Sequence, residues 1–332
     1  MSEKKTVNWA IMGAGNISYA FAKFFPEKNE KCHLLAIGSR SYEKAKKIAD
    51  ECGVERAYGS YEEMLADADI DAVYIGTTTA AHYDCIMACL KAGKHVLCEK
   101  TITVNYRQLK ECVDLAREKG LILAEALTSI YLPVMKFLKD RIDSGIYGKV
   151  QFITVTCGSS KEFDPKNRFY NPESGGGALF DIGCYAFGFA NYFLSSKPTV
   201  VKSEGLLCST GVDTTSATIL RNADDQFATV MLAFDSKTDK IGIIACQKAY
   251  IEVRGFIRPQ GCTVTYMLEE GRKEVFEFPR SGGFDLEAII LSEDILAGKK
   301  ECEICPMDFT LSILEIMDQV RPQWGMELYN ED

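Results

Sequence analysis

The first third of the chain alternates short, mostly apolar runs with amphipathic segments. The apolar runs predict buried strands at residues 6–12, 33–38, 72–75, 95–98 and 121–124. The segments between them have apolar residues at helical spacing and predict helices at 15–25, 42–51, 80–91 and 105–119. This regular alternation of strand and helix predicts a parallel sheet covered by helices on both faces.

The remaining two thirds of the chain have a different pattern. Helices are predicted at residues 133–143, 179–193, 285–296 and 307–320, with a strand at 149–157 followed by a long loop to residue 177. Between residues 199 and 278, apolar and polar residues alternate with a period of two, as at 214–220 and 228–234. This pattern predicts an α+β domain with a mostly antiparallel open sheet. We therefore expect two domains, residues 1–124 and 125–332.

Length and charge agree with two domains and exclude several classes of function. The 332 residues are too many for one ordinary hydrophobic core. Asp and Glu total 47 against 38 Lys and Arg, a formal charge of −9, which argues against nucleic acid or an anionic membrane as partner. The apolar run at 121–127 contains Glu125 and is too short to span a membrane. We expect a soluble, cytoplasmic protein.

The thirteen cysteines are distributed as apolar residues rather than as a disulfide framework. Free cysteine behaves as a small hydrophobic residue, and a reduced compartment is the simplest reading. Cys302 and Cys305 form a single CxxC pair with no histidine near it, so no metal site is expected. Seven cysteines fall within predicted apolar strands or helices: Cys32, Cys85, Cys89, Cys98, Cys112, Cys184 and Cys246.

A glycine-containing turn joins the first predicted strand to the first predicted helix. Gly13 allows the tight turn, and Gly15 lets a pyrophosphate approach the backbone. The helix that opens at Asn16 and Ile17 then offers unpaired N–H donors and the positive end of its dipole. Ser18 is small enough to replace the third glycine of the usual fingerprint. The motif predicts a Rossmann dinucleotide-binding domain.

The end of the second predicted strand indicates which dinucleotide binds. A carboxylate that binds the ribose 2′-hydroxyl of NAD is expected there, but the chain has Ser39 and Arg40. An arginine can bind a 2′-phosphate, and a serine can donate a hydrogen bond to it. We therefore expect NADP, with NAD as the less favoured cofactor. The alternative is that Arg40 only begins a solvated helix.

Polar residues also follow the third and fourth core strands. Thr77, Thr78 and His82 come after the strand at 72–75, and Glu99 and Lys100 come after the strand at 95–98. Parallel α/β sheets bind ligands at the carboxyl ends of their strands, so these residues are candidates for cofactor contact. The alternatives are a surface lysine, a solvated carboxylate and a histidine at a helix start satisfied by solvent.

Four motifs, in order, resemble the glucose–fructose oxidoreductase / inositol dehydrogenase / MocA (Gfo/Idh/MocA) family. They are GAGNIS at 13–18, TTTAAH at 77–82, GKHVLCEK at 93–100 and GGGALFDIGCY at 175–185. The stretch RFYNPE at 168–173 resembles the dimeric dihydrodiol dehydrogenase branch in particular. The resemblance implies NAD(P)-dependent oxidation or reduction of a carbon that bears a hydroxyl, usually on a sugar or polyol. It also implies a homodimer or a higher homo-oligomer, formed through the second domain.

The resemblance implies roles for individual residues. Lys100, Tyr185 and Asp181 match catalytic positions, and Tyr185 stands where the family often has a histidine. A phenol has a pKa near 10 and needs a cation, here Lys100, to act as a general acid and base. Substrate binding is expected from Lys100, Arg168, Asp181 and Tyr185. Cofactor binding is expected from Gly13, Gly15, Asn16, Ile17, Ser39, Arg40, Thr77, Thr78, His82, Glu99 and Lys100.

The chain departs from the family pattern at two places. Thr101 follows Lys100 where a proline is usual, and the residues after Glu125 and Ala126 are LTSIY at 127–131. The expected function is an NADP-dependent oxidoreductase acting on a sugar, polyol or related diol. One alternative is a non-catalytic NAD(P)-binding regulatory protein of the same fold. The other is a glycosidase that transiently oxidises a sugar with tightly held NAD, against which the Ser39–Arg40 pair argues.

Overall fold

The computed structural model describes residues 5–26, 28–267 and 271–329. The chain divides into two compact units, each made of segments that are distant in the sequence. Unit 1 contains Met1–Thr103, Arg107–Ala126 and Ser281–Met307, and unit 2 contains Val104–Tyr106, Leu127–Arg280 and Asp308–Asp332. Each unit has one sheet and its own buried core.

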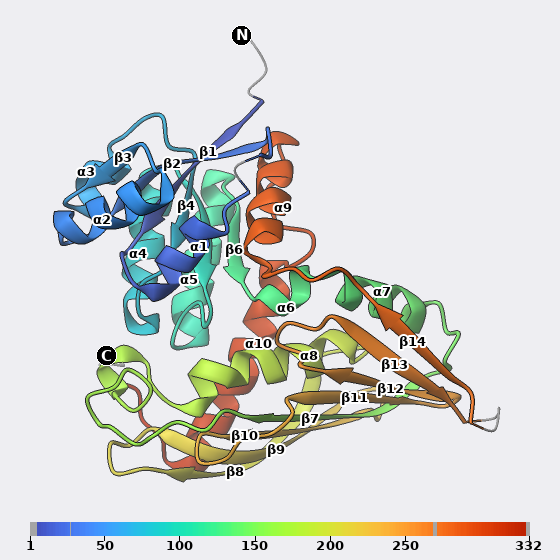
Figure 1. The fold of residues 1–332 in the computed structure, drawn as a ribbon. Helices are drawn as coiled ribbons and strands as arrows, with labels where there is room; N and C mark the ends of the chain where they lie inside the picture. The colour runs from blue at the N-terminus through green and yellow to red at the C-terminus, as the bar shows by residue number, and fades with distance from the viewer. Residues whose placement is uncertain (1–4, 27, 268–270, 330–332) are drawn as a thin grey trace. The chain divides into compact units, whose positions relative to one another are not determined.

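Unit 1 is built on sheet A, which has six parallel strands within the described residues (Figure 1). Their order, β3-β2-β1-β4-β5-β6, is the Rossmann order, and the predicted α/β fold is confirmed. The strands are β1 (Val7–Met12), β2 (Cys32–Gly38), β3 (Arg56–Tyr58), β4 (Ala72–Ile75), β5 (His95–Glu99) and β6 (Leu123–Ala126). The associated helices are α1 (Asn16–Lys23), α2 (Tyr42–Cys52), α3 (Tyr61–Leu65), α4 (Thr79–Lys91), α5 (Tyr106–Lys119) and α9 (Phe284–Leu296).

The segment between α2 and β4 contains two short elements that the hydrophobic pattern did not predict. β3 is a three-residue edge strand whose residues are only partly buried, and α3 has five residues. Neither is long enough to show a clear period of two or of 3.6 residues. β3 nevertheless pairs with β2 at the point where β2 ends in Gly38, so it extends the sheet beside a predicted cofactor contact.

The helix α9 belongs to unit 1, although the sequence placed it in a second domain running from residue 125 to residue 332. Its Phe284 packs edge-on against Phe21 of α1, with ring centroids 6.2 Å apart. Its Ser292 hydroxyl accepts a hydrogen bond of 2.9 Å from the buried Trp9 indole. The predicted division therefore needs correction for residues 281–307. Sequence order could not show that this helix packs on β1 and α1.

Unit 2 contains sheet B, which has eight strands among the described residues, in the order β14-β13-β12-β11-β7-β10-β9-β8. Only the β7–β10 pair is parallel, so the prediction of a mostly antiparallel sheet is confirmed. The strands are β7 (Val150–Gly158), β8 (Pro198–Leu207), β9 (Asp213–Asn222), β10 (Phe227–Ala233), β11 (Ile241–Cys246), β12 (Ala249–Arg254), β13 (Gly261–Tyr266) and β14 (Lys273–Glu277). The helices are α6 (Thr128–Tyr131), α7 (Pro133–Asp143), α8 (Cys184–Phe193) and α10 (Met307–Val320).

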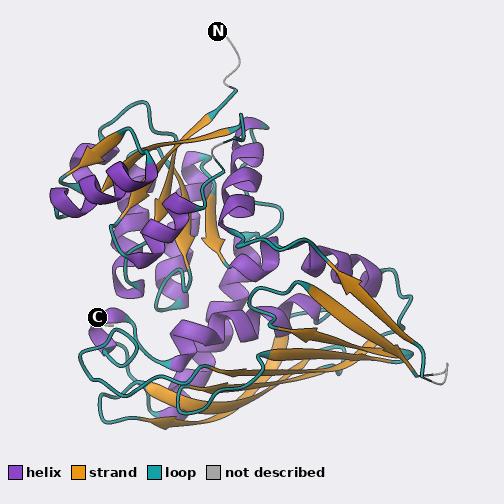
Figure 2. Ribbon diagram, viewed as in Figure 1, coloured by secondary structure: helices purple, strands orange, loops and turns teal. Residues whose placement is uncertain are grey.

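The two faces of sheet B differ in burial. Along β10, Ala228, Val230 and Leu232 are buried while Phe227 and Met231 are exposed, as expected for a strand with one covered face. Helix α8 contacts β7 and β10 on the covered face (Figure 2). The other side is called the open face below. Its large apolar side chains include Phe152, Ile219, Phe227 and Met231.

The seven cysteines predicted to pack as apolar residues are all buried. None of them is in a disulfide, and the same holds for Cys302 and Cys305, which are also buried. No cluster of His, Cys, Asp or Glu that could hold a metal ion occurs in the described part of the chain. Across the same residues, no helix has the length and apolar character needed to cross a membrane.

Candidate functional site

The turn after β1 leaves its backbone open to a ligand. Gly13 has a φ of +108°, which favours glycine, and a Cβ there would lie 3.0 Å from the Gly76 carbonyl oxygen. A Cβ on Gly15 would meet only that oxygen, at 3.9 Å. Gly15 is the N-cap of α1, no side chain caps it, and the first turn of α1 contains no acidic residue. These residues fit the pyrophosphate of a dinucleotide, which would accept hydrogen bonds from the N–H groups of Asn16 and Ile17.

The loop after β4 lies directly beside this turn. The Gly76 N–H donates to the Met12 carbonyl (2.9 Å), and the Ser18 hydroxyl donates to the Gly76 carbonyl (3.3 Å). Ser18 therefore joins α1 to the end of β4, where a third glycine would only permit close packing. Thr77 and Thr78 follow at the start of α4, and Thr78 is its N-cap with no side-chain hydrogen bond. The carboxyl ends of β1 and β4 thus meet at the topological switch point of the sheet.

The end of β2 has the charge pattern that the sequence indicated. Ser39 is buried, and its N–H donates to the Tyr58 carbonyl of β3 (3.2 Å). Arg40 is exposed, and within the described part of the chain no carboxylate pairs with it. The guanidinium therefore keeps its donors available for an anion such as a 2′-phosphate.

Two of the predicted cofactor contacts are buried and bind other parts of the protein. Glu99 accepts the Tyr74 hydroxyl with Oε1 (2.6 Å) and the Lys100 N–H with Oε2 (3.3 Å). The His82 ring is 1% exposed, with Nδ1 2.9 Å from the Thr101 carbonyl oxygen. The alternatives of a solvated carboxylate and a solvent-satisfied histidine are therefore wrong, because strand β5 and helix α4 pack these side chains into the core of unit 1. Lys100, which directly follows Glu99 in the chain, is half-buried.

The Lys100–Thr101 peptide bond is cis, at the position where the family has a proline. The Thr101 side chain is buried, as is that of Ile102 after it.

In unit 2, the glycines before Asp181 permit a close approach between two segments. Gly177 has a φ of +111°, and a Cβ there would lie 2.4 Å from Asp213 Oδ1. Asp213, on β9, accepts the Leu179 N–H with both carboxyl oxygens, at 2.9 and 3.2 Å. The buried carboxylate thus holds the first turn of the helical segment that contains Asp181 and Tyr185.

This segment is helical, as predicted, but its first turn is wider than an α-helix. Leu179–Gly183 is a π-helical turn, and α8 continues from it. π turns often occur at functional sites. Asp181 accepts from the Arg168 guanidinium at 3.4 Å, and the same guanidinium lies 4.1 Å from the centroid of the Phe169 ring. Tyr185 is 6% exposed. The structure thus brings Arg168 and Asp181 together within unit 2.

Two family models match successive parts of the chain. One, described as an oxidoreductase family with an NAD-binding Rossmann fold, matches residues 7–127, and the other, the GFO/IDH/MocA C-terminal domain, matches residues 135–255. A trans-1,2-dihydrobenzene-1,2-diol dehydrogenase of Xenopus laevis is 32% identical over 96% of this chain and 98% of its own. The chain belongs to the Gfo/Idh/MocA oxidoreductase family.

Other proteins are similar to nearly the whole chain at lower sequence identity. The human protein of the same name as the Xenopus relative is 27% identical, covering 96% of this chain and 97% of its own. Among solved structures, a 3-ketoreductase from Actinomadura kijaniata in complex with NADP and TDP-benzene is 22% identical, with a TM-score of 0.82 over 96% of this chain and 97% of its own. A putative NADPH-dependent oxidoreductase from Desulfitobacterium hafniense has a TM-score of 0.87 at 20% identity, covering 97% of this chain and 96% of its own. The two structures establish the family fold.

The predicted family residues fall into two groups. Unit 1 holds the glycine turn, Ser39, Arg40, the threonines after β4 and Lys100, all at the carboxyl ends of strands of sheet A. Unit 2 holds Arg168, Asp181 and Tyr185. Sequence reasoning did not single out Asp213, because an aspartate that begins an alternating strand has no local signal of burial.

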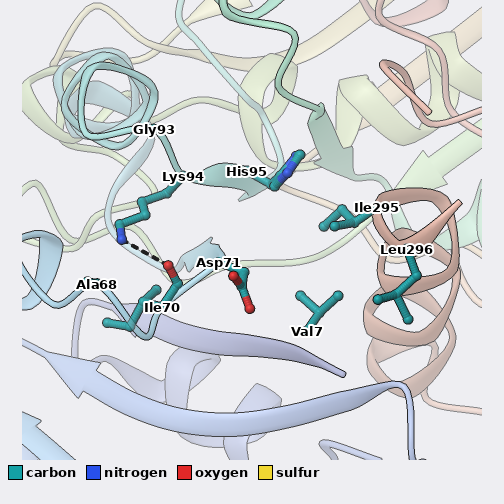
Figure 3. A pocket seen from close by; sticks show the side chains of 9 residues that line it. All are labelled: Val7, Ala68, Ile70, Asp71, Gly93, Lys94, His95, Ile295 and Leu296. Carbon is teal, nitrogen blue, oxygen red and sulfur yellow. Dashed lines mark hydrogen bonds between the residues drawn. The ribbon is translucent and has the colours of Figure 1, made fainter. Parts of the chain in front are cut away.

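A separate pocket lies at the opposite, amino end of sheet A (Figure 3). It has a volume of about 460 Å³ and is lined by residues that begin β1 and β5, by residues preceding β4 and by the end of α9. The Lys94 ammonium there donates hydrogen bonds to the Ile70 and Asp67 carbonyl oxygens, at 2.9 and 2.8 Å. The pocket does not include the glycine turn, Arg40 or Lys100. It is therefore distinct from the predicted cofactor edge.

The Asp213 carboxyl predicts a specific dependence of stability on pH. Burial raises its pKa to about 7, although the Leu179 N–H opposes this shift. Between about pH 4 and pH 7 the folded protein therefore holds a proton that the unfolded chain has released. This group consequently makes the free energy of unfolding fall as pH rises through that range, by up to ~4 kcal/mol.

Asp213→Asn keeps an acceptor for the Leu179 N–H and removes the titration. Urea unfolding of both proteins across this pH range should show the wild type losing stability relative to the variant as pH rises. Two curves that stay parallel over the whole range would contradict the assignment.

Proposed function

We propose that this protein is an NADP-dependent oxidoreductase that transfers a hydride between the nicotinamide and a hydroxyl-bearing carbon of a sugar, polyol or related diol. The observation that carries the proposal is the carboxyl edge of sheet A, where Lys100 follows β5 on the same edge as the glycine turn and Arg40. The relatives named as diol dehydrogenases support a substrate with adjacent hydroxyl groups.

The preference for NADP rests on charge. A carboxylate at the end of β2 would repel a 2′-phosphate, and the chain has the Ser39 hydroxyl and the Arg40 guanidinium there. Arg40 is exposed and can form charge-assisted hydrogen bonds to a dianionic phosphate. The 3-ketoreductase of the same fold was solved in complex with NADP, which supports the same choice.

The bound nicotinamide would accept or donate the hydride, and residues of this chain would manage the accompanying proton. We assign Tyr185 as the general acid and base, because its phenol is the group at the family's proton-transfer position. Lys100 supplies the positive charge that favours the phenolate and orients the substrate hydroxyl. Asp181, held by Arg168 at 3.4 Å, orients the reacting groups, and Arg168 contributes to substrate binding.

A regulatory protein that only binds NAD(P) is the second candidate. The presence of both Lys100 and Tyr185 argues against it, because binding of a dinucleotide requires neither. The reaction itself is tested with NADP and NAD against a panel of aldoses, polyols and trans-diols, following the absorbance of the reduced nicotinamide. Turnover of any member with NADP supports the enzyme. Tight NADP binding with no turnover across the panel supports the regulatory protein.

Arg40→Ala should weaken NADP binding about 5- to 30-fold, because the loss of one charge-assisted hydrogen bond costs ~1–2 kcal/mol. The affinity for NAD should change little, since NAD has no 2′-phosphate. Both dissociation constants are measured by titration calorimetry. Lys47→Ala, which removes an exposed cation on the following helix α2, is the matched control. Equal losses for the two cofactors would remove Arg40 from the 2′-phosphate site.

Tyr185→Phe removes the hydroxyl and keeps the buried ring, so folding and NADP affinity should be preserved. The value of kcat should fall by ~10²- to 10⁴-fold, the usual contribution of general acid–base catalysis. Tyr192→Phe, on the same helix, is the control and should retain normal turnover. Turnover of Tyr185→Phe within about threefold of wild type would eliminate it as the proton donor.

We further propose that the protein is a homodimer in the cytoplasm, joined through the open face of sheet B. Phe152 and Phe227 are partners in the parallel β7–β10 register, and Met231 lies on the same face of β10. These residues are 44–48% exposed, and large apolar side chains gathered on one uncovered sheet face are typical of surfaces that associate with another protein chain. The many free thiols suit a reducing compartment.

Met231→Glu should shift the mass measured by light scattering from twice 36.9 kDa to 36.9 kDa, because a charge buried at the interface would lack a partner. Met267→Glu, at an exposed methionine after β13, should leave the dimer intact. A wild-type protein that is monomeric at micromolar concentration would contradict the proposal.

A further inference from the structure

Three consecutive residues that follow β5 are each held through the backbone by a side chain. The Lys100 N–H donates to Glu99 Oε2 (3.3 Å), His82 Nδ1 lies 2.9 Å from the Thr101 carbonyl oxygen, and the Ile102 N–H donates to Glu125 Oε1 (3.0 Å). The three side chains come from different elements, β5, α4 and β6. We call them the lysine-loop clamp.

The clamp is buried. His82, Glu99 and Glu125 are 1%, 7% and 0% exposed, and the side chains of Thr101 and Ile102 are also fully buried. Backbone polar groups removed from water need hydrogen-bond partners, because leaving one unsatisfied destabilises the fold. Because the chain leaves the sheet at Lys100, β6 pairs with β5 only as far as Glu99. Side chains therefore supply the hydrogen bonds that the sheet cannot.

His82 is neutral at physiological pH, because burial lowers its pKa to about 4. A neutral imidazole carries one hydrogen, and the shorter separation assigns it to Nδ1, which donates to the Thr101 carbonyl. Nε2 lies 3.3 Å from the Thr77 carbonyl oxygen, on the loop after β4. The ring thus spans the loops that follow β4 and β5.

Glu99 connects the clamp to the core. Its Oε1 accepts the Tyr74 hydroxyl at 2.6 Å, and the Tyr74 ring stacks on Phe21 of α1 with centroids 3.7 Å apart. The helix that follows the glycine turn and the loop that contains Lys100 are therefore joined through two aromatic rings and one carboxylate. A shift of this loop would require changes in packed core contacts, which resist such movement.

We propose that His82 is a positioning residue that, together with Glu99 and Glu125, fixes the backbone of residues 100–102 and thereby the origin of the Lys100 side chain. The inference rests on the proposed function, in which Lys100 orients the substrate hydroxyl. It replaces the expectation that His82 contacts the cofactor. Catalysis tolerates little misplacement, and a displacement of 1 Å can cost about 100-fold in rate.

The test compares two variants of His82. His82→Leu fills the space without a donor, whereas His82→Asn places an amide N–H where Nδ1 was. His82→Leu should lower kcat roughly 10- to 100-fold while the dissociation constant for NADP stays within about twofold, and His82→Asn should restore most of the loss. Cys89→Ala, a buried change on the same helix, controls for general destabilisation. A raised NADP dissociation constant with unchanged kcat would show His82 to be a cofactor ligand and overturn the proposal.

The same substitutions made in a Lys100→Met background separate this inference from the proposed function. If His82 acts through Lys100, His82→Leu should change the residual rate of Lys100→Met less than about threefold. An equal loss in both backgrounds would overturn the positioning role. If Lys100→Met retains full turnover, the assignment of Lys100 fails instead.

A readout independent of activity is amide hydrogen exchange of the cofactor-free protein. His82→Leu should accelerate exchange in a peptide covering residues 98–105 about tenfold or more, with His82→Asn close to wild type. Unchanged exchange in His82→Leu would contradict the clamp, whatever reaction the protein catalyses.

Discussion

At the carboxyl end of each strand of sheet A the chain leaves the sheet. The buried backbone N–H and C=O groups there lose their partners on the neighbouring strand and need other hydrogen-bond partners. This constraint is most severe at the topological switch point, where loops from neighbouring strands lie together. The Gly13 N–H donates to the Gly38 carbonyl and the Gly76 N–H to the Met12 carbonyl, so each loop completes the hydrogen bonding of its neighbour. The glycine turn and the loop after β4 are consequently parts of one hydrogen-bonded edge, and His82 of α4 extends this edge to the Thr101 carbonyl in the loop after β5.

The same constraint has a different solution in unit 2. Here the buried group is the start of a helix, and the carboxylate of Asp213 accepts the Leu179 N–H that has no partner within the helix. Gly177 is necessary because a Cβ there would lie only 2.4 Å from Asp213 Oδ1. The GGGALFDIG motif thus contains a glycine that close packing requires, in addition to Asp181.

The distribution of buried polar groups also bears on the choice between an enzyme and a binding protein. A protein that only binds a dinucleotide needs the open turn at Gly13–Gly15 and a cation such as Arg40. It has no need to bury His82, Glu99 and Glu125 around the loop that follows β5. Burying polar side chains carries a desolvation cost even when they are hydrogen-bonded. Their presence beside Lys100 therefore favours a function in which the position of that lysine matters.

The sequence by itself determined the strand–helix alternation, the glycine turn and the family motifs, since these are recorded in local periodicity and in residues adjacent along the chain. It also indicated Lys100 at a strand end and a helix carrying Asp181 and Tyr185. It did not show that α9 packs on Trp9 and Phe21, or that His82, Glu99 and Asp213 are buried against backbone groups. Those contacts join residues that are distant in sequence, or depend on whether a polar side chain turns toward solvent or core. Only tertiary packing decides that direction, because it determines which backbone groups lose water and must find a protein partner.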